Sequence, residues 1–171
     1  MNNYMAFEAL DRAIFSAFCQ SFTSVTWNFN YTSDQFDGYD AMATAITENK
    51  TETFDVELKS VFLKKLLPYC YFQPDKWLAL VGGENNVKVY FVIYPLLNKI
   101  AVWRLSGDLL KASEKDIKPM NRNTLRSPEK CLKHVYLLEL NKAKVFDVDL
   151  TQWKDKYNAL YLQTREKKER L

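Results

Sequence analysis

This chain of 171 residues contains little glycine, proline, cysteine or histidine, and these shortages exclude several classes of protein. Four glycines and five prolines, with no internal repeat, predict a globular protein. The three cysteines lie far apart and form no C-x-x-C pair, which argues against zinc and thioredoxin-like motifs. Their odd number fits a reducing compartment. The single histidine, His134, argues against histidine-dependent nuclease or metalloprotease chemistry.

Long apolar runs are also missing, since no stretch approaches the length that spans a membrane. Glu8, Asp11 and Arg12 interrupt the apolar pattern near the N-terminus, which therefore does not resemble a signal peptide. We expect a cytoplasmic or nucleoid-associated protein without a membrane partner. The net charge of +3 and the pI of about 8.6 permit a polyanionic partner but do not demand one.

Apolar residues are abundant: 47% of the chain is hydrophobic and 15% is aromatic, which is enough to build the core of one domain. Apolar spacing predicts a helix over residues 6–20. Pro74 and the pair Gly82-Gly83 bracket a second helix over 75–81. Alternating polarity predicts strands over residues 25–31, 39–46, 53–61, 87–94, 99–105 and 134–140. Residues 62–71 fit either a helix or a loop.

These elements predict a mixed α/β (α+β) fold, in which a central mixed sheet of about five or six strands is flanked by helices. We expect a single domain over residues 1–171, with its core at about 6–140. A C-terminal helix over about 151–165 and a basic tail follow the core.

The strand predicted over residues 53–61 has a strict alternation of apolar and charged side chains. Successive side chains leave opposite faces of a strand, so Asp55, Glu57 and Lys59 share one face. The preceding strand is expected to form a hairpin with it and to bring Asp40 alongside. An acid-x-Lys triplet occurs four times in the chain, but only Glu57 and Lys59 lie in a regular apolar strand pattern.

This layout is suited to holding a divalent cation beside a scissile phosphate. Mg²⁺ prefers oxygen ligands and is usually held by one or two carboxylates, waters and substrate oxygens. Asp40 and Glu57 can supply the carboxylates, and the backbone carbonyl of Leu58 lies in the same strand. Lys59 would orient the attacking water or stabilise the anionic transition state.

The order of helix, strand, Asp-bearing strand, Glu-x-Lys strand, helix and strand over residues 7–105 resembles the PD-(D/E)XK nuclease superfamily. This is the fold of many restriction enzymes, junction resolvases and repair nucleases. The resemblance implies a restriction-endonuclease-like fold and Mg²⁺-dependent or Mn²⁺-dependent hydrolysis of nucleic-acid phosphodiester bonds, with DNA as the first expectation. It also implies a homodimer or a larger assembly.

Carried over by position, the resemblance makes Asp40 and Glu57 the metal ligands and Lys59 the catalytic base. Asp37 is the alternative metal ligand, because Tyr39 replaces the proline that gives the family its name. The helix acid that some members use corresponds to Glu8.

Plainer interpretations stand beside these. Glu57 and Lys59 also fit an exposed ion pair, Asp55 a solvated strand end, and Glu8 a solvent-facing helix position. The polar segment over residues 106–133 fits either a phosphate-contacting surface or a mobile loop; its basic residues include Lys111, Lys115, Lys118, Arg122 and Arg126. The alternative for the whole chain is a catalytically inactive nuclease-fold protein that binds nucleic acid or protein, for instance a phage-related accessory factor.

Overall fold

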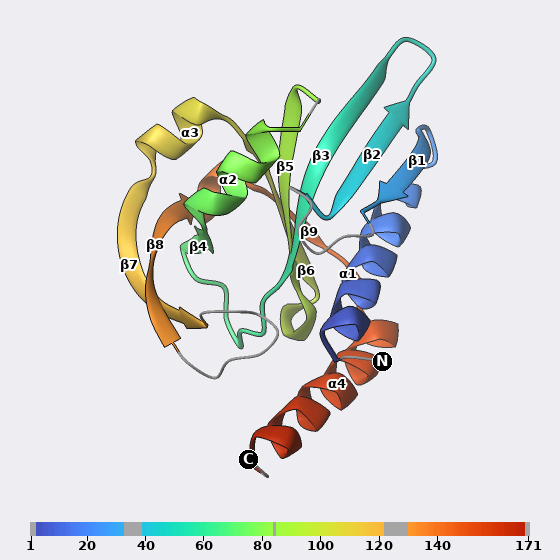
Figure 1. Ribbon diagram of the computed structural model, residues 1–171. Helices are drawn as coiled ribbons and strands as arrows, with labels where there is room; N and C mark the ends of the chain where they lie inside the picture. Colours follow the sequence, from blue (N-terminus) through green and yellow to red (C-terminus); the bar gives the residue numbers. More distant parts are fainter. Residues whose placement is uncertain (1–2, 33–38, 84, 122–129, 170–171) are drawn as a thin grey trace.

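The computed structural model describes residues 3–32, 39–83, 85–121 and 130–169 (Figure 1). The helices are α1 (Asn3–Gln20), α2 (Pro74–Val81), α3 (Gly107–Ala112) and α4 (Thr151–Glu169). The strands are β1 (Thr26–Tyr31), β2 (Ala41–Ile46), β3 (Thr51–Ser60), β4 (Tyr69–Phe72), β5 (Val87–Tyr94), β6 (Lys99–Leu105), β7 (Glu114–Asn121), β8 (Lys130–Glu139) and β9 (Lys144–Asp147). Short 3₁₀ turns follow β5 and β8.

A six-stranded sheet in the order β1-β2-β3-β5-β6-β9 forms the centre of the molecule. Its β3–β5 pair is parallel and its other neighbouring strands are antiparallel. The predicted mixed sheet flanked by helices is therefore confirmed, and so is the hairpin between β2 and β3. A second sheet has three strands in the order β4-β8-β7.

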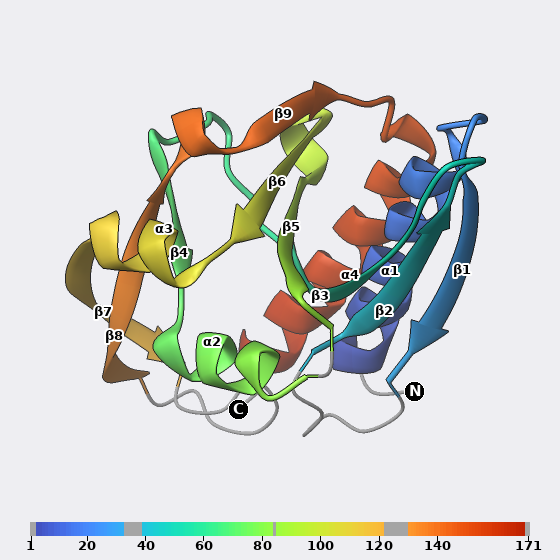
Figure 2. The same cartoon turned by 90° about the horizontal axis from the view of Figure 1, so that it is seen from above.

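The central sheet separates two hydrophobic cores, and alternation along β5 assigns side chains to each. Phe91 and Ile93 face the core that α1 and α4 cover, and Tyr157 of α4 is part of it. Tyr90 and Val92 face the opposite core, where Trp103 is fully buried. Figures 1 and 2 show α1 and α4 on one side of the sheet, with α2, α3 and the second sheet on the other.

The predicted termini of α2 agree with the structure. The helix begins at Pro74, whose missing N–H is not needed in a first turn, and ends at Val81 before Gly82. The C-terminal helix also forms, and it continues to Glu169. Among the described helices, none is both long and apolar enough to cross a membrane.

The segment over residues 106–133 differs from the polar loop that we considered. It contains α3, β7 and the beginning of β8, which starts four residues before the predicted position 134. β4 and β9 are further strands that the sequence pattern did not indicate. β4, β7 and β9 lie at sheet edges, and β7 and β9 carry the charged residues and the proline that protect exposed edges, so apolar alternation is weak there.

Candidate active site

The site is built around the end of β3, whose β2 side has no strand partner among the described residues; we call it the open edge of β3. β2 pairs with β3 only as far as Val56, whereas β5 pairs with β3 up to Ser60. Residues 57–60 of β3 therefore extend past the beginning of β2. A strand edge of this kind presents backbone groups that need partners.

Asp40 lies at this opening, directly before β2. Its backbone amide donates to the carbonyl of Val56 at 3.0 Å, which continues the ladder by one bond. Its side-chain Oδ2 then accepts a hydrogen bond from the amide of Leu58 at 2.8 Å. The carboxylate thus takes the place that a further strand residue would occupy, and its position is fixed by the backbone of β3.

The carbonyl of Leu58 faces the same opening as its amide. The N–H and C=O of one strand residue point to the same neighbouring strand, as in a hydrogen-bonded antiparallel pair. Because the Leu58 amide points to Asp40, the Leu58 carbonyl oxygen also points toward the β2 side of β3. A backbone oxygen and a carboxylate therefore lie along one edge.

Glu57 is a buried carboxylate with only half of its hydrogen-bonding capacity used. Its side chain is 8% exposed, and its Oε1 forms an ion pair with Nζ of Lys76 on α2 at 2.8 Å. Its Oε2 is buried and has no hydrogen-bond partner among the described residues. Burial, with the negative charge of Asp40 second, raises the pKa of Glu57 to about 7. The two carboxylates are therefore close enough to repel each other.

Lys59 provides positive charge on the same face of β3. Its side chain is exposed, and its charge lowers the pKa of both Glu57 and Asp11 against the larger effect of their burial. The structure thus brings Asp40, Glu57 and Lys59 into one electrostatic neighbourhood.

The acid that α1 contributes to this neighbourhood is Asp11, which the sequence argument did not select. Its Oδ1 accepts hydrogen bonds from the hydroxyls of Ser60 and Tyr157, which lie on β3 and α4. Burial raises the pKa of Asp11 to about 6, and the charge of Asp40 adds to the increase. Its position in the sequence could have indicated that it is buried, because Asp11 lies within the apolar stripe of α1, four residues after Phe7 and three before Ile14.

Glu8, the predicted helix acid, instead forms an ion pair with Arg12 one turn along α1. Arg12 also donates to the carbonyl of Thr32 at 2.7 Å. Glu8 therefore helps to attach α1 to the end of β1, and it is Asp11 that interacts electrostatically with Asp40 and Lys59.

Asp55 shares the face of Glu57 but is not the solvated strand end that we considered, which is a correction. It is fully buried and forms an ion pair with Nζ of Lys88 on β5 at 2.5 Å. Its other oxygen accepts from Nδ2 of Asn85 at 2.5 Å. Gly83 after α2 and the parallel strand β5 lie against it, so Asp55 forms a structural ion pair, whereas Glu57 is only partly paired and Lys59 is exposed.

The basic residues proposed to contact phosphates lie on several elements. Lys111 is exposed in α3, and Lys115 of β7 lies 5.8 Å from the ring centre of Tyr136. Lys118 forms an ion pair with Asp116 at 2.6 Å, and its Nζ lies 5.8 Å from the ring centre of Tyr71. Asp37, Arg122 and Arg126 lie outside the described residues.

The donor set fits a hard divalent cation with two protein carboxylates. Within the ranges that the structure describes, no group of three or more His, Cys, Asp or Glu side chains is placed to hold a metal ion. Asp40, Glu57 and the Leu58 carbonyl nevertheless supply oxygen ligands, and the unpartnered Oε2 of Glu57 lacks a donor or a cation. One or two carboxylates suffice for Mg²⁺ when waters and substrate oxygens complete its octahedron.

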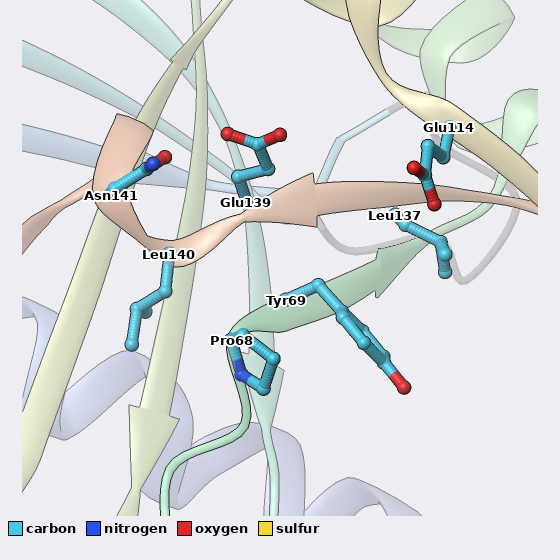
Figure 3. A pocket seen from close by; sticks show the side chains of 7 residues that line it. All are labelled: Pro68, Tyr69, Glu114, Leu137, Glu139, Leu140 and Asn141. Atoms are coloured by element: carbon cyan, nitrogen blue, oxygen red, sulfur yellow. The ribbon is translucent and has the colours of Figure 1, made fainter.

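Two hollows lie elsewhere on the surface. One has a volume of about 440 Å³ and is lined by residues of the second sheet and of the turn after it (Figure 3): Pro68, Tyr69, Glu114, Leu137, Glu139, Leu140 and Asn141. The other, about 430 Å³, lies between α1, β9 and the start of α4. Neither is lined by Asp40, Glu57 or Lys59, which follow the open edge of β3.

Comparison with protein-family models, curated proteins and solved structures returns no match for this chain. The geometry of the site is therefore the basis for inferring a function.

Proposed function

We propose that the protein is a metal-dependent nuclease that hydrolyses phosphodiester bonds, with DNA as its substrate, and that it belongs to the PD-(D/E)XK superfamily. One observation carries the proposal: the Leu58 amide fixes the Asp40 carboxylate at the open edge of β3, where its charge acts on the buried Glu57, one oxygen of which has no partner among the described residues. Lys59 supplies positive charge beside this pair of acids. These residue types in this arrangement support hydrolysis of a phosphodiester rather than acyl transfer.

Asp40, Glu57 and the carbonyl of Leu58 would hold Mg²⁺ or Mn²⁺ at the edge of β3. When bound, such an ion lowers the pKa of a coordinated water and neutralises the charge that builds up on the phosphate. The protein contributes rigidity, because Asp40 is held by a backbone amide and Glu57 lies in a buried part of a strand. Preorganised ligands of this kind cost little reorganisation during reaction.

Lys59 would orient the attacking water and stabilise the negative charge of the transition state. Asp11 serves as its electrostatic counterpart from α1, held in place by the hydroxyls of Ser60 and Tyr157. The exposed side chain of Lys59 is accessible to a polymer lying along the strand edge. Lys111, Lys115 and Lys118 would contact phosphates away from the scissile bond without reading sequence.

The proposal is tested by incubating plasmid DNA, single-stranded DNA and RNA with the protein in Mg²⁺ or Mn²⁺. We expect DNA cleavage by the wild type and a loss of about a hundredfold or more in Glu57→Gln and Lys59→Met. Lys99→Met is the matched control, since Lys99 pairs with Asp147 at the far edge of the same sheet. Equal rates in wild type and Glu57→Gln would assign the activity to another site or to a contaminant.

A second candidate is a nuclease-fold protein that binds nucleic acid or assembles with a partner without cleaving. Two observations favour it: in the described residues no third acidic ligand joins the two carboxylates, and Lys76 already neutralises Glu57. Binding of DNA without cleavage in either ion would support this candidate over the enzyme.

A further inference from the structure

The ion pair between Glu57 and Lys76 is asymmetric. Glu57 is nearly enclosed, with 8% of its side chain exposed, whereas the Lys76 side chain is 41% exposed and lies in the first turn of a surface helix. The flexible stem of a lysine lets its charged end move without displacing the helix that carries it. Of the two partners, Lys76 is the one that can move away.

The charge balance of the site indicates why Lys76 is there. Three acids, Asp11, Asp40 and Glu57, lie along residues 57–60 of β3, and the single charge of Lys59 does not match theirs. Burying a carboxylate without a cation is costly, and a paired positive charge reduces that cost. Lys76 supplies that charge at Oε1, while Oε2 of the same carboxylate has no partner within the described part of the chain.

We propose that Lys76 is a displaceable cation: it occupies Glu57 in the metal-free protein and transfers to a substrate phosphate when a divalent ion takes its place. This inference rests on the proposed function. A divalent ion on Glu57 removes the need for the ammonium and repels it. The released ammonium then lies beside the phosphate that the same ion binds, where a point charge is an effective phosphate ligand.

Further lysines lie near the helix that carries Lys76. Gln73 stands one turn earlier, at the N-terminus of α2, and its Oε1 accepts from Nζ of Lys133 on β8 at 3.4 Å. Lys118 lies opposite Lys133 in the ladder between β7 and β8. Lys133 and Lys118 thus add lysine side chains on the second sheet, near α2, where a phosphate backbone could contact them.

Calorimetric titration with Mn²⁺ at a pH above 8, without substrate, tests the first half of the proposal. Lys76→Met should bind Mn²⁺ about threefold to tenfold more tightly than wild type, because the competing ammonium is gone. Lys99→Met, which removes a lysine from a distant ion pair, should bind as wild type does. Lys76→Gln provides the same comparison if the methionine variant is poorly folded.

The salt dependence of DNA binding tests the second half. In Ca²⁺, which takes the same oxygen ligands, the slope of log affinity against log salt should be larger by about one for wild type than for Lys76→Met. Without a divalent ion the two slopes should agree, because Lys76 is then held by Glu57.

The outcomes distinguish failure of the proposed metal site from failure of the displaceable cation. If Glu57→Gln does not weaken Mn²⁺ binding to the protein, the proposed function fails and the inference with it. If Glu57→Gln weakens binding but Lys76→Met leaves it unchanged or weakens it, the proposed metal site survives and the displaceable cation is disproved. A difference in salt slope that is present equally with and without Ca²⁺ would also overturn the inference.

Discussion

At the scale of single residues, Asp55 and Glu57 show how two acids on one face of one strand acquire different roles. Asp55 has a partner for each carboxylate oxygen, with Lys88 on one and Asn85 on the other. Glu57 has one oxygen paired and, as far as the structure describes the chain, one without a partner. A fully satisfied buried ion pair is stable and inert, whereas an incompletely satisfied one can accept a ligand.

Removing the charge of Asp55 should destabilise the fold strongly, since it leaves the ammonium of Lys88 buried without its counter-charge. We expect Asp55→Asn to lower the free energy of unfolding by about 3–5 kcal/mol, measured by urea denaturation. Asp147→Asn breaks an ion pair with an 86% exposed acid and should cost less than about 1 kcal/mol. Comparable losses in the two variants would show that Asp55 is not a buried structural charge.

At the scale of elements, α2 and the residues directly after it contact both buried acids of β3, Asp55 and Glu57. Its first turn carries Lys76, which holds Glu57, and the turn after it ends in Gly83, which lies against Asp55. The pair Gly82-Gly83 correctly indicated the end of a helix. What requires glycine at position 83 is a tertiary contact: a Cβ there would lie 2.4 Å from Oδ2 of Asp55.

Gly83→Ala should therefore lower the free energy of unfolding by about 1–3 kcal/mol, because the added methyl group pushes on a buried carboxylate whose position is fixed by Lys88. Gly107→Ala is the matched control, since a Cβ at that position meets nothing within 4 Å. That variant should be neutral or more stable by up to about 1 kcal/mol. Equal thermal unfolding midpoints for the two variants would contradict the close approach of Gly83 to Asp55.

At the scale of the whole molecule, the site depends on three elements that are distant in sequence. Asp11 on α1 bonds to Ser60, 49 residues away, and to Tyr157, 146 residues away. Tyr157 is fully buried and stacks on Phe7, so the C-terminal helix is part of the core that holds the acid. Packing of α4 on α1 therefore sets the electrostatics beside β3.

The two raised acid pKa values predict how stability depends on pH. The pKa rises from 3.8 to about 6 for Asp11 and from 4.5 to about 7 for Glu57, so between these values the folded chain keeps protons that the unfolded chain releases. Stability from these groups is fully present below about pH 4. It falls as pH rises through 6 and 7, by about 3 kcal/mol per group.

Urea denaturation between about pH 4 and pH 8 measures this effect as a difference between proteins. The free energy of unfolding of wild type, relative to Asp11→Asn, should decrease across the window and level off above about pH 6. The free energy of unfolding of wild type relative to Glu57→Gln should decrease in the same way and level off above about pH 7. Parallel pH profiles for wild type and both variants would show that neither acid has a raised pKa.

Short-range features of the fold followed from the sequence. Strict alternation over residues 53–61 placed Glu57 and Lys59 on one face of β3, and the preceding strand brought Asp40 next to it through a hairpin. Proline and glycine marked the ends of α2. These features depend on neighbours within a few residues, which a linear pattern records.

The sequence by itself therefore determined the class of fold and the strand pair at the centre of the candidate site, because periodicity and hairpin formation are local. Only the tertiary structure decided that Asp55 is buried against Lys88, that the charge of Lys59 acts on Asp11, and that Lys76 pairs with Glu57. Those contacts join segments that are distant in sequence, and their partners follow from how helices and sheets pack. The tertiary structure also decided where the edge strands β4, β7 and β9 pair, since that pairing depends on which sheet edge is available.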